Sequence, residues 1–376
     1  MSASKDKRVN VVIVGAGPAG TACAAHLGTL SVGDVVLTDR HDFPRDKTCG
    51  SGLSPKGIKT LRDLGVWHEI EPHSYPITGI RLVTQSGEES YMSAGTAAEA
   101  VVCERRVLDH KLLLKALSRG AVFVPDFNAT DVLTENGRVA GVRSSDGVEV
   151  RAKIVVIAGG AHCRIGQPEA RPRQVIQAIM GWWSGVSFRE GHVEMIFDEM
   201  LAPYYGWLFP EGPDRVNIGI TYEDTPGAPK HNARELFQRF LDKHYKARLA
   251  DAKATKPWKG HPIVWNAAPS KLTRPGAIIV GEAGLMTHPA TAEGIYQGMR
   301  SGMLAAEAIA DTLRFGVDEA VAFRDYERAC NKAFRGSFVA GVVFRKLMRT
   351  RALDWVLRAS KSPGVESVTA KLLAAI

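Results

Sequence analysis

A chain of 376 residues that is 45% hydrophobic and 23% charged has the composition of an ordinary soluble globular protein, and it is long enough for two intertwined domains. No apolar run approaches the roughly 18 residues of a membrane-spanning helix, and five scattered cysteines without a C-x-x-C pair argue against a disulfide framework or a zinc site. The formal net charge of +8 accompanies no recognised nucleic-acid-binding motif, so we do not expect a nucleic-acid partner.

The first predicted elements form a strand–turn–helix–strand unit. Residues 9–14 are an apolar strand, residues 21–30 an alanine-rich helix, and residues 34–38 a second strand that leads to an acid. The turn reads GAGPAG, and its glycines permit a tight turn and a close approach of the backbone to a pyrophosphate. The helix N-terminus stabilises phosphates, and the acid accepts hydrogen bonds from ribose hydroxyls. The predicted dinucleotide site comprises Gly15, Gly17, Pro18, Ala19, Gly20, Asp39 and Arg40.

The remaining elements predict a parallel βα domain that is interrupted by an antiparallel sheet. A Gly- and Pro-rich loop covers residues 43–57. Strand patterns are expected within 76–102 and at 122–124, 139–142, 154–158, 180–188, 192–197, 204–209, 216–222 and 277–280. Helices are expected near 55–64, at 105–119, at 231–248 and at about 293–314.

This order of elements predicts a discontinuous nucleotide-binding domain of residues 1–75, 103–165 and 273–330. Residues 76–102 and 166–272 then form a substrate domain. The polar residues 1–8 lead directly into the first strand, so we expect no signal peptide and, with the cysteine usage, a cytoplasmic protein.

Residues 331–376 form a basic C-terminal helical segment. From Lys332 onward nine basic residues face only two acidic ones, a net charge of +7, and apolar residues lie between them at near-helical spacing. Either the segment is a helical cap packed on the body of the protein, or it is an amphipathic helix pair on the inner face of an anionic membrane.

Three later motifs resemble those of FAD-dependent oxidoreductases of the hydroxylase type. Residues 105–113 match R-x-x-L-D-x-x-L-L, and residues 154–164 (IVVIAGGAHCR) resemble the strand and turn that follow. Residues 281–302 resemble the last FAD motif, whose helix N-terminus points at the flavin edge on which negative charge develops. This resemblance implies that FAD is bound by Arg105, Gly160, Gly281, Glu282, Pro289, Gly294 and Ile295.

Two further segments resemble the geranylgeranyl reductase family. Residues 43–55 (FPRDKTCGSGLSP) resemble its P-R-x-K-x-C-G-G-G-L-S-P loop, and residues 205–210 (YGWLFP) resemble its Y-x-W-x-F-P segment. The resemblance implies a fold like that of p-hydroxybenzoate hydroxylase, which is a glutathione-reductase-like FAD-binding βαβ fold with an inserted antiparallel substrate sheet. It also implies reduction of isoprenoid double bonds. Flavin halogenases are relatives, but the chain has no W-x-W-x-I-P motif, which disfavours halogenation.

The loop at 43–55 supplies candidate cofactor contacts. The glycine-rich run at Cys49 and Gly50 lets the backbone approach the flavin ring, and Arg45 and Lys47 carry charge that can counter phosphate or the reduced flavin. Cys49 is either a redox or positioning group at the flavin or a small buried residue in a tight loop.

The aromatic strand supplies candidate substrate contacts. Tyr205, Trp207 and Phe209 alternate and therefore face one side, where they form either the wall of an apolar tunnel or plain sheet core, and Trp182 flanks the same region. His288 precedes the proline of the last FAD motif and is either a proton-transfer group or an ordinary loop histidine. The catalytic candidates are thus Cys49, His288 and Trp207.

The chain departs from the family pattern at several positions. Residues 158–160 read AGG where Asp-Gly is usual, Glu282 replaces an aspartate, and Ala292 replaces a glycine. These departures predict a specialised member whose substrate differs from geranylgeranyl.

The hypothesis that follows is an FAD-dependent oxidoreductase that reduces C=C bonds of a prenyl or other apolar lipid-like substrate by hydride transfer, with NAD(P)H or another electron donor. The first alternative is an FAD-dependent monooxygenase that hydroxylates or epoxidises an apolar substrate. The second is a flavoprotein maturation factor without turnover.

Overall fold

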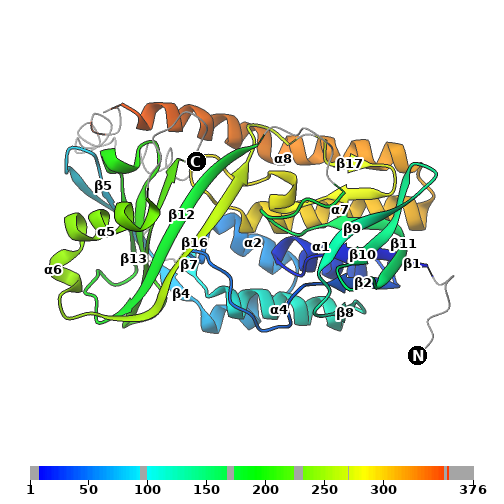
Figure 1. The fold of residues 1–376 in the computed structure, drawn as a ribbon, viewed down its shortest axis with the longest axis horizontal. Coiled ribbons are helices and arrows are strands. Elements are labelled where there is room, and N and C mark those ends of the chain that lie inside the picture. The colour runs from blue at the N-terminus through cyan, green and yellow to red at the C-terminus, as the bar shows by residue number, and fades with distance from the viewer. Residues whose placement is uncertain are drawn as a thin grey trace.

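Three sheets organise the part of the chain that the structure, a computed structural model, describes: residues 8–93, 100–166, 173–223, 232–269, 271–350 and 354 (Figure 1). The strands are β1 (Val9–Val14), β2 (Val35–Thr38), β3 (Gly52–Leu53), β4 (Tyr75–Ile77), β5 (Gly79–Val83), β6 (Glu89–Ser93), β7 (Ala100–Val102), β8 (Val122–Val124), β9 (Ala129–Glu135), β10 (Arg138–Ser144), β11 (Glu149–Ile157), β12 (Gln174–Ser184), β13 (His192–Ile196), β14 (Gly206–Pro210), β15 (Arg215–Glu223), β16 (Lys253–Trp265), β17 (Thr273–Arg274) and β18 (Ala277–Ile279). The helices are α1 (Pro18–Thr29), α2 (Pro55–Asp63), α3 (Trp67–Ile70), α4 (Arg105–Ser118), α5 (Ala233–His244), α6 (Lys246–Leu249), α7 (Ile295–Phe315) and α8 (Glu319–Met348), with short 3₁₀ turns at Glu71–His73, Glu199–Leu201 and Gly281–Gly284.

The first sheet is built around the predicted strand–turn–helix–strand unit. β1 pairs in parallel with β2 on one side and with β11 on the other, and the strand order is β17-β18-β11-β1-β2-β8. Val11, Val12 and Ile13 are fully buried because both faces of the sheet are covered. The helix of the unit begins at Pro18, three residues earlier than predicted, since proline suits the first position of a helix.

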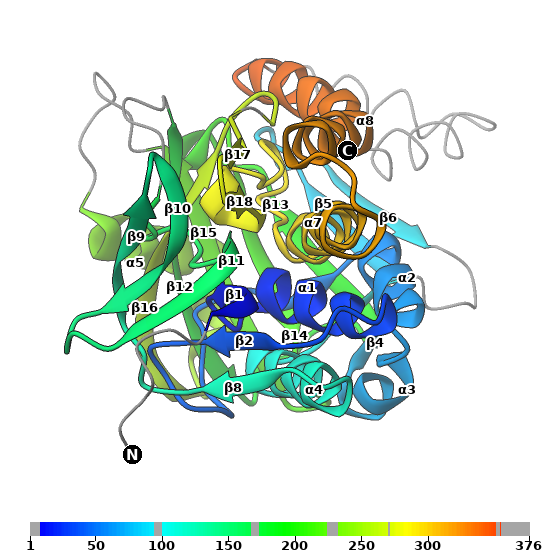
Figure 2. The ribbon, with the colours of Figure 1, turned by 90° about the vertical axis from the view of Figure 1, so that its right-hand side faces the viewer.

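Helices and a hairpin cover opposite faces of this sheet. Figure 2 shows α1, α4 and α7 on one side and the β9–β10 hairpin on the other. α1 and α7 cross closely at Gly302, which has no side chain. A Cβ at this position would overlap the carbonyl oxygen of Ala19. This crossing places the N-termini of both helices near the carboxyl end of β1, where ligands of parallel sheets bind.

The second sheet is mostly antiparallel and has the strand order β16-β12-β15-β14-β13-β5-β6. Its outer face packs against α5 through Phe237 and Phe240. Its inner face carries an aromatic cluster that also includes Phe344 and Met348 at the end of α8. The small sheet β3-β7-β4 takes its first strand, β3, from the end of the 43–55 loop.

Some element boundaries differ from those predicted. In place of the single helix predicted at 231–248, the structure has two helices, α5 (Ala233–His244) and α6 (Lys246–Leu249), and the strands β9 and β16 were not predicted at all. α8 runs as one helix through the predicted boundary at residues 330–331, so the basic segment begins inside it. The predicted helix pair after Lys332 is described only up to residue 350 and at Asp354. Its other residues lie outside the described part of the chain.

Candidate functional site

The glycine turn after β1, which we call the cradle, leads into a helix N-terminus that no side chain caps. Gly15 has φ +103°, and a Cβ there would lie 2.5 Å from the carbonyl oxygen of Ala158, while a Cβ at Gly20 would overlap the carbonyl oxygen of Gly15. Gly17 is the N-cap of α1, no side chain caps this helix end, and its first turn holds no acid. The first N–H groups of α1 are therefore available to a phosphate, and the helix dipole favours one.

Asp39 lies beside the cradle at the end of β2. Its Oδ2 accepts a hydrogen bond from the N–H of Ala16 at 2.8 Å, and its Oδ1 accepts one from the N–H of His41 at 3.0 Å. The carboxylate is thus fixed in orientation, as a ribose-binding acid needs to be. The neighbouring Arg40 is exposed. Burial is the main reason why the pKa of His162 is lowered, and the positive charge of Arg40 lowers that pKa further.

A buried ion cluster lies next to the cradle. Asp109, which is 0% exposed, accepts from Arg105 Nε at 2.7 Å and Nη2 at 2.8 Å, and Arg45 Nη1 lies 3.2 Å from the same carboxylate. Burial lowers the pKa of Arg105, but Asp109 and Cys49 outweigh this effect and raise it. A Cβ at Gly17 would lie 3.8 Å from Arg45 Nη2, so the guanidinium extends to the phosphate cradle.

A second, half-buried cluster joins the 43–55 loop to β16 and to the turn after β18. Lys47 Nζ donates to His261 Nε2 at 3.0 Å, and the pKa of His261 is lowered to about 3 by burial and by Lys47. Burial also lowers the pKa of Lys47, Arg105 lowers it further, and Glu282 opposes both. Glu282 accepts from the N–H of Val264 at 3.2 Å, and burial raises its pKa. The carboxyl group that stands in the usual aspartate position is therefore held among cations.

The N-terminus of α7 is a second uncapped helix end. Its N-cap is Gly294, no side chain caps it, and its first turn, from Ile295, holds no acid. The Oγ1 of buried Thr287 lies beside Gly294 and has no hydrogen-bond partner in the described structure. Glu293 accepts from Ser54 and from Gln297, and burial raises its pKa. A negatively charged cofactor edge suits this end of the helix.

Residues in the remaining motifs adopt left-handed backbone conformations, which favour glycine. Gly160 has φ +74°, and an added Cβ would meet nothing within 4 Å. Gly281 has φ +60° and donates its N–H to Ser301 Oγ at 2.9 Å. Ala292, where glycine is usual, has φ +56°, a conformation that costs an alanine about 1–2 kcal/mol.

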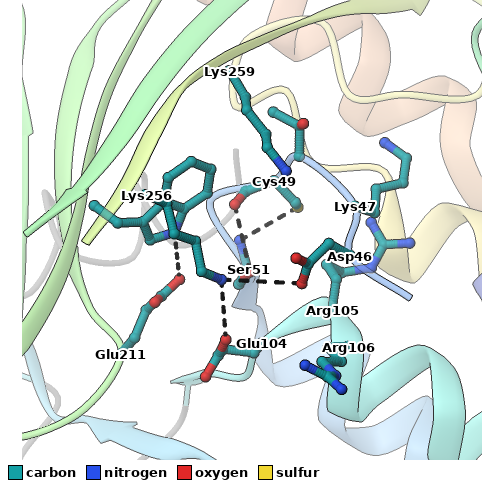
Figure 3. A pocket seen from close by; sticks show the side chains of 12 residues that line it. Asp46, Lys47, Cys49, Ser51, Glu104, Arg105, Arg106, Glu211, Lys256 and Lys259 are labelled. Atoms are coloured by element: carbon teal, nitrogen blue, oxygen red, sulfur yellow. Dashed lines mark hydrogen bonds and ion pairs between the residues drawn. The ribbon is translucent and has the colours of Figure 1, made fainter. Parts of the chain in front are cut away.

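The 43–55 loop also borders an open pocket. The N–H of Ser51 donates to Cys49 Sγ at 3.3 Å, and the thiol group of Cys49 also interacts with Arg105. Figure 3 shows Lys256 reaching from β16 between Asp46 and Glu104. The pocket is lined by Asp46, Lys47, Thr48, Cys49, Ser51, Glu104, Arg105, Arg106, Trp182, Glu211, Lys256 and Lys259.

Tyr205, directly before β14, forms one row with Trp207 and Phe209 of β14 on the inner face of the second sheet. The ring centroids of Tyr205 and Trp207 lie 6.3 Å apart, and those of Trp207 and Phe209 lie 6.1 Å apart. A Cβ at Gly50 would lie 3.3 Å from the Trp207 indole nitrogen, so this row faces the 43–55 loop. We call the row, together with Trp182 on β12, the aromatic wall. Trp183 points to the opposite face and packs on α5.

Polar and small residues on β15 hold the aromatic wall in place. Trp207 Nε1 donates to Oδ1 of the fully buried Asn217 at 2.7 Å, and a side chain at Gly219 would overlap the indole ring. Tyr205 donates its hydroxyl to the carbonyl oxygen of Thr291 at 2.6 Å, which ties the wall to the loop before α7. The wall therefore has one defined conformation against the cofactor motifs.

His288 is 2% exposed and joins the loop before α7 to α8. Its Nδ1 accepts from the N–H of Thr291 at 3.2 Å, and its Nε2 lies 3.1 Å from the carbonyl oxygen of Ser337, to which it donates. Both ring nitrogens are engaged, and His288 does not line the pocket described above. Burial lowers its pKa to about 4, which keeps the imidazole neutral at pH 7.

We predict that His288 makes stability fall in mild acid. Its folded pKa of about 4 lies below the unfolded value near 6.5, so the unfolded chain binds the extra proton between these values. The contribution of His288 to the free energy of unfolding is therefore complete above about pH 6.5. It declines towards pH 4 by up to ~1.4 kcal/mol per pH unit. Urea unfolding over this pH range measures the slope, and His288→Gln is expected to flatten it. Equal slopes for both proteins would contradict the assignment.

Sequence reasoning missed four residues of this site. Asp109 stood inside the R-x-x-L-D motif, and its position four residues after Arg105 on a helix was the signal for an ion pair. Glu293 and Asn217 also lay within recognised segments. His261 lies on the unpredicted strand β16, and no local pattern pointed to it.

Comparisons with known proteins agree with this geometry. The family model described as "FAD binding domain" matches residues 8–333. Menaquinone reductase of Mycolicibacterium smegmatis is 31% identical over 80% of this chain and 76% of its own length. Digeranylgeranylglycerophospholipid reductase 2 of Methanopyrus kandleri is 27% identical over 97% of this chain and 96% of its own length.

Solved structures share the fold. A geranylgeranyl bacteriochlorophyll reductase-like protein from Thermoplasma acidophilum superposes with a TM-score of 0.85 at 22% identity, covering 97% of this chain and 99% of its own. The flavin-dependent brominase Bmp2 superposes with a TM-score of 0.81 at 21% identity, covering 98% of this chain and 94% of its own. The resemblance to geranylgeranyl reductases that residues 43–55 and 205–210 indicated is confirmed.

Proposed function

Because this chain belongs to the FAD binding domain family and is an FAD-dependent oxidoreductase, we propose that it reduces C=C bonds of a prenyl or similarly apolar lipid. The observation that carries the proposal is the aromatic wall, which faces the 43–55 loop and is tied by Tyr205 to the loop before α7. Two relatives are named for menaquinone and for a digeranylgeranyl lipid, and both compounds carry isoprenoid chains.

The residues present fit FAD. Two uncapped helix N-termini, at Gly17 and Gly294, offer N–H groups to phosphates and to the flavin edge, and Asp39 is oriented for a ribose. Arg45 and Arg105 supply positive charge beside the first helix end. FAD, when bound and reduced, would supply the hydride for an alkene, and a proton from water or from a side chain would complete the addition of two hydrogens.

The protein's own contribution is to position the alkene and exclude water. An unactivated C=C bond offers no polar group to hold, so apolar packing against Trp207, Phe209 and Tyr205 has to orient it. We propose that Cys49 acts at the reacting centre, because it borders the pocket and lies one residue from the Gly50 contact with Trp207. We assign His288 to holding the loop before α7, since both its nitrogens are engaged.

We predict that Trp207→Leu lowers kcat/KM for a prenyl substrate by roughly 10–100-fold, the equivalent of about 1–3 kcal/mol of lost positioning, while FAD remains bound. The indole fills the space over Gly219, and leucine leaves part of it empty. The matched control is Trp183→Leu, which changes an equally buried tryptophan on the opposite face of the same sheet. Steady-state kinetics measure both variants. An equal loss in kcat/KM for the two would count against the aromatic wall as the substrate site.

A monooxygenase remains the second candidate, because the fold is shared with a flavin-dependent brominase and with a probable FAD-dependent monooxygenase of Pseudomonas aeruginosa. Turnover with NAD(P)H under ¹⁸O₂ separates the two functions. A reductase gives a product that is two hydrogens heavier and free of ¹⁸O, whereas a monooxygenase gives an ¹⁸O-labelled product. We propose NAD(P)H as the electron donor, and its consumption in this assay tests it. Because the relatives are named as reductases, we do not retain the maturation-factor alternative.

We keep peripheral membrane contact through the basic C-terminal segment as part of the proposal. Its described part is the second half of α8, which follows the inner face of the second sheet. Among the described residues no helix is both long and apolar enough to cross a membrane.

A further inference from the structure

The second half of α8 presents an apolar ridge to the outside. Val339, Val343 and Leu347 are 48%, 52% and 47% exposed, and they recur at four-residue steps, so they lie along one side of the helix. Among the other large exposed apolar side chains of the described chain, Tyr91, Val122 and Val148 lie on separate strands or loops, and Val321 lies 18 residues before Val339 on α8. Three in line on one helix make a continuous surface, which we call the outer ridge.

Positive charge accompanies the outer ridge. Lys332, Arg335 and Lys346 are exposed on the same side of α8, within one or two turns of the ridge residues. The sequence from residue 332 to residue 350 contains no aspartate or glutamate. In this part of the helix, Glu223 on β15 forms ion pairs with Arg345 and Arg349. It does not pair with Lys332, Arg335 or Lys346.

The opposite side of the same helix reaches the proposed substrate site. Met348 is 5% exposed and belongs to the aromatic cluster with Trp207 and Tyr205. The rings of Phe344 and Phe197 lie 6.3 Å apart in that cluster. α8 therefore separates the aromatic wall from the outside by the thickness of one helix (Figure 1).

We propose that the outer ridge docks the protein on an anionic lipid bilayer. A row of apolar side chains that is bordered by lysine and arginine fits the boundary between acyl chains and anionic headgroups. A second copy of this chain fits less well, because a symmetric contact would place the exposed cations against each other. The docking deepens the membrane contact of the proposed function, because it names the surface that makes the contact, and it needs no turnover. Delivery of a lipid from the bilayer past α8 to the aromatic wall, in contrast, rests on the proposed function.

Sedimentation of the full-length, FAD-loaded protein with vesicles tests the docking. The vesicles contain equal parts of phosphatidylcholine and phosphatidylglycerol, and phosphatidylcholine vesicles are the reference. We expect binding to the anionic vesicles that is lost in about 1 M salt, where the Debye length is about 3 Å. Each cation near an anionic surface contributes roughly fivefold to binding, so the triple variant K332Q/R335Q/K346Q is expected to bind about a hundredfold more weakly.

Matched variants separate the ridge from charge and folding effects. The control for charge is K153Q/K246Q/K253Q, which removes the same charge from exposed lysines on β11, α6 and β16. The apolar variant V343Q/L347Q is compared with V148Q, which changes an equally exposed valine in a loop. The proposal expects binding to fall only for the α8 variants. Equal binding by all variants, no binding to anionic vesicles, or a dimer in sedimentation velocity that V343Q/L347Q dissociates would each overturn it. Failure of the C=C assay leaves these outcomes unaffected, so the two proposals fail independently.

Discussion

Replacing Asp109 by asparagine is expected to lower the free energy of unfolding by about 3–5 kcal/mol, because it leaves the buried guanidinium of Arg105 without its counter-charge. Asp109 is 0% exposed and holds Arg105 by two hydrogen bonds and Arg45 by an ion pair. Asparagine keeps the shape of the side chain but removes the charge, so two cations then face each other. Urea unfolding of the cofactor-free protein measures the loss.

The control is another acid four residues after its partner on a helix. Lys59 and Asp63 form such a pair on α2, but they are 74% and 48% exposed, so Asp63→Asn is expected to cost no more than about 0.5 kcal/mol. Saturating FAD is expected to reduce the Asp109→Asn penalty, since its phosphates supply negative charge near Arg45. Equal penalties for the two substitutions would show that the buried cluster does not stabilise the fold.

The substitution Gly20→Ala is expected to weaken FAD binding by more than about a hundredfold, equivalent to some 3 kcal/mol. A Cβ at Gly20 would overlap the carbonyl oxygen of Gly15, which is backbone and is itself held against Ala158. The turn has to open, and the N-terminus of α1 then moves away from the phosphate position. Isothermal titration with FAD measures the affinity.

Gly33→Ala provides the comparison for this glycine. It lies four residues after the end of α1 in an exposed loop, and an added Cβ would meet nothing within 4 Å. It is expected to leave FAD affinity unchanged and to alter stability by less than about 1 kcal/mol. Retention of FAD affinity by Gly20→Ala would contradict the role of the turn as a phosphate cradle.

Local patterns predicted the cofactor half of the molecule well. The strand, the glycine turn and Asp39 follow one another within a short stretch, so periodicity and turn chemistry were sufficient to identify them. The alternation of Tyr205, Trp207 and Phe209 likewise predicted that they share a face, which the ring distances confirm.

Features that depend on contacts between distant segments could not be predicted in this way. β16 contains Pro257, Gly260 and Pro262 and lies at the edge of its sheet, where proline is tolerated, so its sequence carries no strand alternation. The contact of His261 with Lys47 depends on that strand. α8 continues through Gly336 and Gly341, and the second of these lets the helix approach His288, since a Cβ there would lie 2.8 Å from the imidazole.

The most direct test of the central claim is an anaerobic single turnover. The FAD-loaded protein is photoreduced, mixed with geranylgeranyl diphosphate or a polyprenyl quinone, and followed by flavin absorbance and by product mass. Our account predicts that the flavin reoxidises without oxygen and that the prenyl chain of the product gains two hydrogens. A flavin that stays reduced until air is admitted, with a product that then gains oxygen, would contradict it and assign the protein to the monooxygenases.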